Sequence, residues 1–251
     1  MSELGPLEGK AALVTGASSG LGRATAITLA HSGADVALVA RSAEELQSAK
    51  EEVSKRDPRA LSLPTDLAKE EETSATVERT VEEFGRIDVL VNAAGTDAPG
   101  SVEELSVEGW DRTLDVNLRA PFLLSKAAFP YMREAGGGTI INISSVAGKK
   151  GWANASAYCA SKFGLTGLTE ALADEGKEHR IRAIVLYPGA MATNWGAFSP
   201  EERQEGESKV ASVSEVLPPE RVAEFIAWLA ATPPGFVLTE ALVVPIGEEL
   251  P

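Results

Sequence analysis

The sequence of 251 residues predicts an α/β fold in which a doubly wound parallel β-sheet of about seven strands carries helices on both faces. Three observations lead to this prediction. Short apolar runs alternate with longer helical patterns over the whole chain, which is typical of a parallel sheet wrapped by helices. The apolar runs are continuous and rich in β-branched residues, as expected for strands that are buried on both faces. A glycine-rich first turn and a strand count nearer seven than eight favour an open sheet over a closed barrel.

The first half of the chain is expected to form four strands and three helices. The expected strands are Ala11–Thr15, Val36–Ala40, Ala60–Leu63 and Asp88–Val91. Gly20–His31 follows the glycine-rich turn as the first helix. A second helix starts after Ser42, which matches a capping box with Glu45, and runs to about Arg56. The highly charged stretch Lys69–Phe84 predicts a third, exposed helix that Gly85 closes.

The second half continues the same alternation. The expected helices are Trp110–Tyr131, Ser156–Glu178 and Pro219–Ala231, and the expected strands are Thr139–Ile143, Arg182–Leu186 and Ala241–Val244. No linker, low-complexity stretch or short repeat interrupts this pattern. We therefore predict a single domain over residues 1–251.

Charge and composition exclude several classes of function. Lys and Arg number 23 against 37 Asp and Glu, which gives a net charge of −14 and argues against nucleic acid or anionic membranes as partners. The single cysteine, Cys159, fits a reducing compartment, and with only two histidines, His31 and His179, no metal site is predicted. The first residues lack a signal-peptide pattern, and the longest uncharged stretch, 183–200, contains two prolines and two glycines. We therefore expect a cytoplasmic protein without a membrane span.

The first turn, Thr15–Gly22, has the sequence TGASSGLG and joins the first strand to the first helix. Three glycines in this place allow backbone amides to approach a pyrophosphate, and the helix N-terminus adds partial positive charge. The spacing is G-x-x-x-G-x-G rather than the commoner G-x-G-x-x-G. An ordinary tight turn is the alternative, which the position directly after the first strand makes less attractive.

Two further segments end neighbouring strands. Asn92–Gly95 (NAAG) ends the fourth strand, where an open parallel sheet has its ligand crevice, and Asp66 follows the third. The Asp66 carboxylate could accept a hydrogen bond from an adenine amino group. Either segment alone could be an ordinary turn, but their common position at the carboxyl ends of strands favours ligand contact.

Residues with acid–base chemistry gather later in the chain. Tyr158 and Lys162 are four residues apart on an expected helix, so they lie on one face. A phenol must lose ~3 units of pKa, about 4 kcal/mol, to ionise at neutral pH, and an ammonium at ~4 Å with an effective dielectric of ~20 supplies a similar amount. Ser144 and Ser145 follow the fifth strand, where one hydroxyl is expected to cap the turn and the other to face a substrate oxygen. Asn117 lies within an expected helix, where Asn is mildly disfavoured; a packing role is its alternative.

Together these segments resemble the short-chain dehydrogenase/reductase family in its single-domain branch. The residues that carry the resemblance are Thr15–Gly22, Asn92–Gly95, Asn117 within DVN, Ser145, Tyr158–Lys162 (YCASK), and Pro188-Gly189 with Thr193. They cover about residues 9 to 195 in the family's order. Each motif alone is unspecific, but all six in order are highly specific. The resemblance implies a Rossmann-type domain that transfers hydride between a nicotinamide cofactor and a small carbonyl or alcohol substrate.

The family also implies a role for each matching residue. Tyr158 would be the proton donor or acceptor, Lys162 would bind the nicotinamide ribose and lower the phenol pKa, and Ser145 would orient the substrate oxygen. Asn117 would hold a water molecule in the proton relay. The residues expected to contact the cofactor are Gly16, Ser18, Ser19, Gly20, Leu21, Gly22, Arg41, Ser42, Asp66, Leu67, Asn92, Ala93, Ala94, Gly95, Tyr158, Lys162, Pro188, Gly189 and Thr193.

NADP(H) is expected in preference to NAD(H). Enzymes of this fold that prefer NAD hold the adenosine ribose with an acidic side chain at the end of the second strand, where this chain has Ala40. Arg41 follows, and its guanidinium can bind a 2′-phosphate, with Ser42 adding a hydroxyl. Charge-assisted bonds of ~1.5–3 kcal/mol correspond to roughly 10- to 150-fold discrimination. Ser19 stands where some NADP-preferring relatives carry a second basic residue, so the preference is expected to be moderate.

The C-terminal part departs from the family. Many relatives have a glycine after the position of Thr239 and Asp-Gly-Gly after the last strand, whereas this chain has Glu240 and Pro245-Ile246-Gly247. This difference puts in doubt the usual tetramer contact through the last strand. Residues 190–217, with Trp195 and Phe198, are expected to form the substrate-binding loop region.

The resemblance also implies a homodimer or homotetramer, because the family's long fourth and fifth helices usually form a dimer. The uncharged faces of these helices in this chain contain Phe122, Leu123, Phe129, Phe163, Leu165 and Leu168. Two other functions remain open. One is a carrier-bound 3-oxoacyl reductase, which the −14 charge disfavours because its carrier would be acidic. The other is a regulator that binds the dinucleotide without catalysis, which would not need Asn117, Ser145, Tyr158 and Lys162 together.

Overall fold

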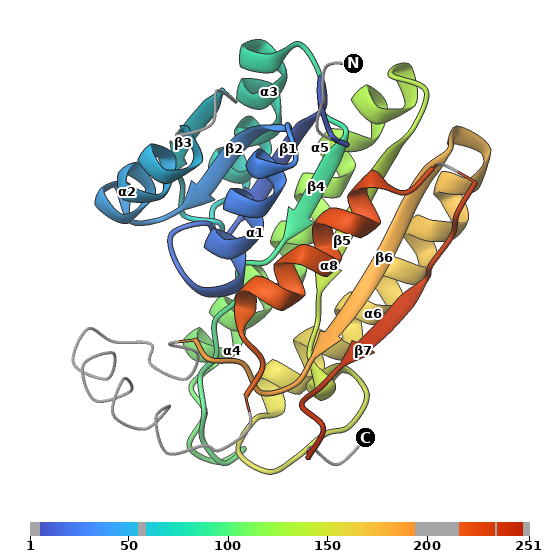
Figure 1. Cartoon of the computed structure of the whole chain (residues 1–251). Helices are drawn as coiled ribbons and strands as arrows, with labels where there is room; N and C mark the ends of the chain where they lie inside the picture. The colour runs from blue at the N-terminus through green and yellow to red at the C-terminus, as the bar shows by residue number, and fades with distance from the viewer. Residues whose placement is uncertain (1–5, 55–58, 194–215, 234, 248–251) are drawn as a thin grey trace.

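The computed structural model describes residues 6–54, 59–193, 216–233 and 235–247 (Figure 1). Seven parallel strands form one sheet in the order β3-β2-β1-β4-β5-β6-β7. The strands are β1 Ala11–Thr15, β2 Asp35–Ala40, β3 Ala60–Pro64, β4 Val89–Asn92, β5 Gly138–Ile143, β6 Ile181–Pro188 and β7 Glu240–Val243. The predicted doubly wound sheet is confirmed. The strand order reverses between β1 and β4, which in such sheets opens a crevice at the carboxyl ends of the strands.

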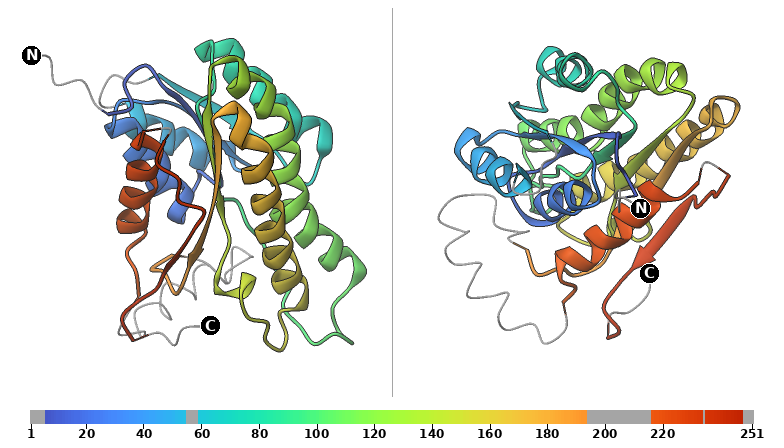
Figure 2. Two further views of the ribbon diagram at one scale, coloured as in Figure 1. Left: turned by 90° about the vertical axis from the view of Figure 1, so that its right-hand side faces the viewer. Right: turned by 45° about the horizontal axis from the view of Figure 1, so that its top comes forward.

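Helices cover both faces of this sheet (Figure 2). They are α1 Gly20–His31, α2 Ala43–Val53, α3 Glu70–Phe84, α4 Val107–Leu114, α5 Ala120–Glu134, α6 Ser156–Gly176 and α8 Pro219–Ala231. A π-helical turn, Asp115–Arg119, joins α4 to α5, and two 3₁₀ turns lie at Val146–Gly148 and Lys177–His179. No helix in the described part of the chain is long and apolar enough to span a membrane.

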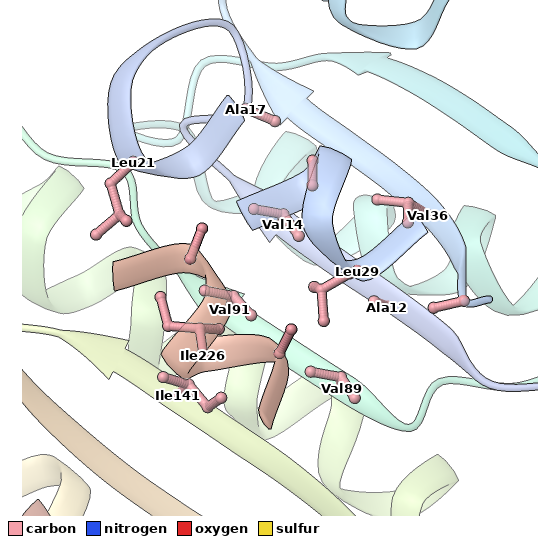
Figure 3. Packing of buried hydrophobic residues seen from close by; sticks show 14 of the residues in the cluster. Ala12, Val14, Ala17, Leu21, Leu29, Val36, Val89, Val91, Ile141 and Ile226 are labelled. Carbon is pink, nitrogen blue, oxygen red and sulfur yellow. The ribbon is translucent and has the colours of Figure 1, made fainter. Parts of the chain in front are cut away.

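Two hydrophobic clusters fix the layers. One joins α1, α2 and α8 to one face of the sheet; Figure 3 shows Leu29 of α1 and Ile226 of α8 over Val14, Val91 and Ile141. The other joins α3, α5 and α6 to the opposite face, through the alternate residues of the same strands. Each central strand is therefore buried on both faces, which explains its uninterrupted apolar sequence.

The helix expected over Trp110–Tyr131 is present, but it is longer and it is not α-helical throughout. The structure has α4, then the π-helical turn, then α5. Pro121 explains part of this change in hydrogen bonding: it lacks an amide hydrogen, so the carbonyl of Asn117 cannot accept the usual α-helical bond from the residue four positions ahead. Single π turns inside helices are frequently found at functional sites.

The expected partner-facing surface is smaller than the sequence indicated. Leu123 and Leu165 are buried within the chain, so they cannot belong to an exposed face. Phe122 of α5 and Phe163 of α6 remain 45% and 47% exposed. An apolar surface on these two helices therefore stays available, with the two phenylalanines as its largest exposed members.

Candidate active site

The glycine-rich turn between β1 and α1 has no room for a side chain at Gly16 or Gly22. A Cβ atom added to Gly22 would lie 2.3 Å from the carbonyl oxygen of Gly16, and Gly16 and Gly20 have positive φ angles of 69° and 52°. The first turn of α1 contains no acidic residue, and Ser19 at its N-cap does not use its hydroxyl to cap the helix. The positive end of α1 is therefore not neutralised locally, which suits a phosphate group.

Thr15 holds the NAAG segment against this turn. Its hydroxyl oxygen accepts hydrogen bonds from the backbone amides of Ala93 (3.0 Å) and Ala94 (3.1 Å). A Cβ on Gly16 would lie 2.9 Å from the Cα of Ala94, so the two segments are in direct contact. Sequence reasoning missed Thr15, although a hydroxyl on the last residue of a strand at the switch point is a usable signal.

Asn92, expected to bind the cofactor, directs its side chain into the fold. Its amide nitrogen donates to Asn142 Oδ1 at 2.7 Å, and Asn142 in turn donates to Thr169 Oγ1 at 2.8 Å. This buried chain of hydrogen bonds links β4 and β5 to α6. The side chain of Asn92 thus positions the strands that carry the site, and its amide nitrogen is engaged within the fold.

The residues expected around the adenosine lie at the ends of β2 and β3. Arg41 is exposed immediately after β2, and Ser42 Oγ caps α2 by accepting from the amide of Glu45 at 3.3 Å. The Ser42 hydroxyl keeps its proton for donation. Asp66 lies 3.6 Å from the guanidinium of Arg112. Leu67, which follows Asp66, is buried.

The segment after β6 closes the other side of the crevice. The Gly189 amide extends the sheet by donating to the carbonyl of Val243 at 2.9 Å. A Cβ on Gly20 would lie 3.4 Å from the methyl carbon of Thr193, so this segment reaches across to the glycine-rich turn. Two hydrogen bonds of 2.9 Å join Leu217 to Ala190 and Ala192. They fix the base of the expected substrate loop, whose Trp195 and Phe198 lie outside the described residues.

Ser145, Tyr158 and Lys162 meet at the carboxyl end of β5. A hydrogen bond joins the hydroxyls of Ser145 and Tyr158. The Lys162 ammonium donates to the carbonyl of Ile143 at 2.8 Å and lies 5.5 Å from the centre of the Tyr158 ring. The expectation that one of Ser144 and Ser145 caps the turn while the other faces the substrate is not met. Ser145 both caps the 3₁₀ turn and contacts Tyr158, while Ser144 is buried and donates to the carbonyl of Lys162.

Burial dominates the electrostatics of this group, and the expected lowering of the Tyr158 pKa by Lys162 is not found: the ammonium lies 5.5 Å from the ring centre, and the phenol pKa is raised. Burial raises the pKa of the Tyr158 phenol, against the opposing effect of the hydrogen bond with Ser145, while the negative charge of Asp97 raises it further. Burial also lowers the pKa of Lys162 to about 8. Both residues thus lie in a dry environment that disfavours their charged forms, as is common at functional sites.

Asn117 lies in the π-helical turn and binds two neighbouring segments. Its side chain exchanges two hydrogen bonds of 2.8 Å with the backbone of Thr96, just after the NAAG segment. Its amide also donates to Ser161 Oγ at 3.0 Å, and Ser161 donates to the carbonyl of Tyr158 at 2.7 Å. Asn117 therefore joins the β4 loop to the helix that carries Tyr158.

A family model described as short chain dehydrogenase matches residues 10–204. The chain belongs to the short-chain dehydrogenase/reductase family. It is 38% identical over 237 residues to cyclohexanol dehydrogenase from Acinetobacter sp., with 94% of this chain and 93% of the relative covered. It is 35% identical over 240 residues to a 3-oxoacyl-[acyl-carrier-protein] reductase from Thermotoga maritima, with 94% and 96% covered.

The fold gives the same result. The crystal structure of a metagenomic short-chain oxidoreductase in complex with NADP matches with a TM-score of 0.83 and 35% identity, covering 97% of this chain and 100% of that chain. The resemblance drawn from the motifs is thus confirmed. This short-chain dehydrogenase/reductase belongs to an oxidoreductase family that acts on alcohol and carbonyl groups.

Proposed function

We propose that this short-chain dehydrogenase/reductase is an NADP(H)-dependent enzyme that transfers hydride between nicotinamide and a small carbonyl or alcohol substrate. The observation that carries the proposal is the meeting of Ser145, Tyr158 and Lys162 at the end of β5, on the same edge of the sheet as the glycine-rich turn. A nicotinamide dinucleotide, when bound, supplies or accepts the hydride. The side chains described below supply the proton and the binding energy.

The residues present fit such a cofactor. The close backbone contacts around Gly16 and Gly22 leave the phosphates a surface of amides rather than side chains. The end of α1 is free of acidic residues in its first turn, which favours an anion there. Lys162 would hold the nicotinamide ribose, and Pro188, Gly189 and Thr193 would line the nicotinamide side.

Tyr158 is the proposed acid–base group. Because burial raises the pKa of its phenol, Tyr158 holds its proton at neutral pH, which is the form that donates to a developing alkoxide. Ser145, already bonded to Tyr158, would hold the substrate oxygen beside the phenol. Asn117 would bind the relay water through its backbone carbonyl, which Pro121 leaves without the usual helical donor. The positive charge of Lys162 would stabilise the phenolate that remains after proton donation.

The proposal is tested by Tyr158→Phe, with Tyr131→Phe on α5 as the matched control. Tyr158→Phe should reduce kcat at least 10²-fold with NADPH affinity nearly unchanged, because only the ionisable oxygen is removed. Lys162→Ala should weaken both kcat and cofactor binding. Steady-state kinetics on a panel of ketones, aldehydes and alcohols, with cofactor binding measured separately, gives both quantities. Full kcat in Tyr158→Phe would refute the assignment.

NADP(H) preference rests on the end of β2. Ala40 presents no carboxylate to repel a 2′-phosphate, and Arg41 and Ser42 provide a guanidinium and a hydroxyl donor. The solved metagenomic relative with NADP supports the same choice. Arg41→Ala should lower the NADPH/NADH ratio of kcat/KM roughly 10- to 150-fold, and the exposed control Arg79→Ala should leave it unchanged. A wild-type enzyme that prefers NADH would contradict this part of the proposal.

A carrier-bound 3-oxoacyl reductase is the second candidate, because the Thermotoga maritima relative has that name. The net charge of −14 disfavours docking of an acidic carrier, so we expect higher kcat/KM for free ketones than for carrier thioesters. The reverse order would favour the second candidate. Tight NADPH binding without turnover of any carbonyl or alcohol would instead indicate a regulator.

A further inference from the structure

Asp97 lies on a segment that is fixed at both ends beside the proposed catalytic residues. On one side, Thr96 exchanges its two 2.8 Å hydrogen bonds with Asn117. On the other side, Gly100 forms a β-bridge with Ala155, three residues before the proposed proton donor. The loop after β4 therefore runs along the site, and Asp97 lies between its two fixed points.

The carboxylate of Asp97 has few partners in this position. One oxygen accepts a hydrogen bond of 2.7 Å from the amide of the adjacent Ala98. Among the described residues, no lysine, arginine or histidine forms an ion pair with it. The side chain is partly buried, and this burial raises the pKa of the carboxyl group. A carboxylate that is withdrawn from water without a counter-ion is costly, and such groups concentrate at functional sites.

The charge of Asp97 also reaches the reacting centre. It raises the pKa of the Tyr158 phenol, whose oxygen is proposed to exchange a proton with the substrate. The pKa of that phenol also depends on burial, on the hydroxyl of Ser145 and on Cys159. The ammonium of Lys162 lies 5.5 Å from the ring centre. A substrate oxygen held at the phenol, and the groups next to it, would lie in the same field.

We propose that Asp97 determines substrate specificity by favouring neutral substrates that carry a hydroxyl near the reacting carbonyl and rejecting anionic ones such as keto acids. The hydroxyl donates a hydrogen bond to the Asp97 carboxylate, in addition to the one that the Ala98 amide donates. A carboxylate on the substrate would instead place two like charges close together in a partly dry site. This inference rests on the proposed function of the site.

The test compares two methyl ketones of equal chain length: 4-hydroxybutan-2-one, which is neutral and carries the hydroxyl, and acetoacetate, which carries a carboxylate. Their kcat/KM values are measured with saturating NADPH at pH 8, and the ratio of hydroxyketone to keto acid is the readout. Wild-type enzyme should give a ratio above 10. Asp97→Asn, which keeps the shape but removes the charge, should lower the ratio at least tenfold, equal to ~1.4 kcal/mol.

Two further variants keep the test decisive. Asp111→Asn removes an exposed carboxylate from α4 and should leave the ratio within twofold of wild type. Asp97→Ser retains an acceptor for the Ala98 amide and should lower the ratio as Asp97→Asn does, so a folding defect of one variant does not decide the outcome. An unchanged ratio in the folded Asp97 variants would overturn the inference, as would a wild-type enzyme that prefers acetoacetate. If wild type reduces other carbonyl compounds through Tyr158 but not the hydroxyketone, this inference fails and the proposed function stands.

Discussion

Replacing Gly22 by alanine should open the glycine-rich turn and weaken cofactor binding. An alanine is the better helix former, and by propensity alone it would stabilise α1 by roughly 1 kcal/mol. Packing opposes this gain. The new Cβ would lie 2.3 Å from the carbonyl oxygen and 2.6 Å from the carbonyl carbon of Gly16, well short of the 3.4 Å at which ordinary contact begins.

Both opposing atoms are backbone, so relief requires the turn itself to move by about 1 Å relative to α1. Overpacking of this kind costs ~1–3 kcal/mol, which exceeds the gain in propensity. The same movement displaces the amides proposed to bind the pyrophosphate. Loss of a single charge-assisted bond, at ~1.5–3 kcal/mol, would raise the Kd for NADPH roughly 10- to 150-fold.

Urea denaturation of the free protein and calorimetric titration with NADPH measure the two effects separately. Gly151→Ala is the matched control, since a Cβ added there meets no atom within 4 Å, and its stability should stay within about 0.5 kcal/mol of wild type. If Gly22→Ala bound NADPH with wild-type affinity, the close approach of turn and helix would not be what shapes the cofactor site.

Three other predictions concern the stability of the fold and the oligomeric state. The Asp88 carboxylate is 7% exposed; burial opposes its ionisation, but bonds from Arg86, the Ala11 amide and a lysine lower its pKa overall. Asp88→Ala should therefore reduce the free energy of unfolding by ~2–4 kcal/mol at pH 7, as measured by urea titration. Because the folded-state pKa is depressed, this difference should be full above pH ~4 and disappear as pH falls through the folded-state pKa; a pH-independent difference would contradict it. Thr15→Val leaves two amides without their acceptor and should cost ~1–3 kcal/mol in the same assay while weakening NADPH binding; equal stability would refute its bridging role. Finally, a homo-oligomer is predicted through the exposed Phe122 and Phe163, so light scattering at micromolar concentration should show at least a dimer and Phe163→Glu a monomer, whereas a monomeric wild type would exclude the prediction.

The sequence was sufficient to predict the features that depend on neighbouring residues, such as the bounds of helices and strands and the capping of helices. Strand β1 and helices α1 and α8 have the bounds expected from apolar runs and from the residues that start and end helices. Ser42 caps α2 as the capping box predicts, because its hydroxyl and the amide it binds are three residues apart. The order of the motifs was enough to predict the family.

Contacts between distant residues decided what the sequence left open or misjudged. The helical pattern around Asn117 is locally continuous, and only its bonds to Thr96, 21 residues away, show what the π-helical turn holds in place. Asn92 has the appearance of a ligand in its motif, but its side chain is taken by Asn142, 50 residues later. Neither partner can be read from periodicity, because each pair joins segments that lie far apart in the chain: two strands of the parallel sheet for Asn92 and Asn142, and a turn and a loop for Asn117 and Thr96.

By itself, the sequence determined the fold class, the position of nearly every element, the oxidoreductase family and the set of polar residues from which a site can be built. Tertiary structure alone decided which of these residues meet, such as Ser145 with Tyr158. It also added two residues that the sequence did not single out: Thr15, which binds the NAAG segment, and Asp97, whose charge acts on the Tyr158 phenol. The physical reason is the distance along the chain over which each effect acts. Propensity, capping and burial patterns act within a few residues, whereas hydrogen bonding and charge act between whichever groups the packed sheet and helices bring within a few ångströms.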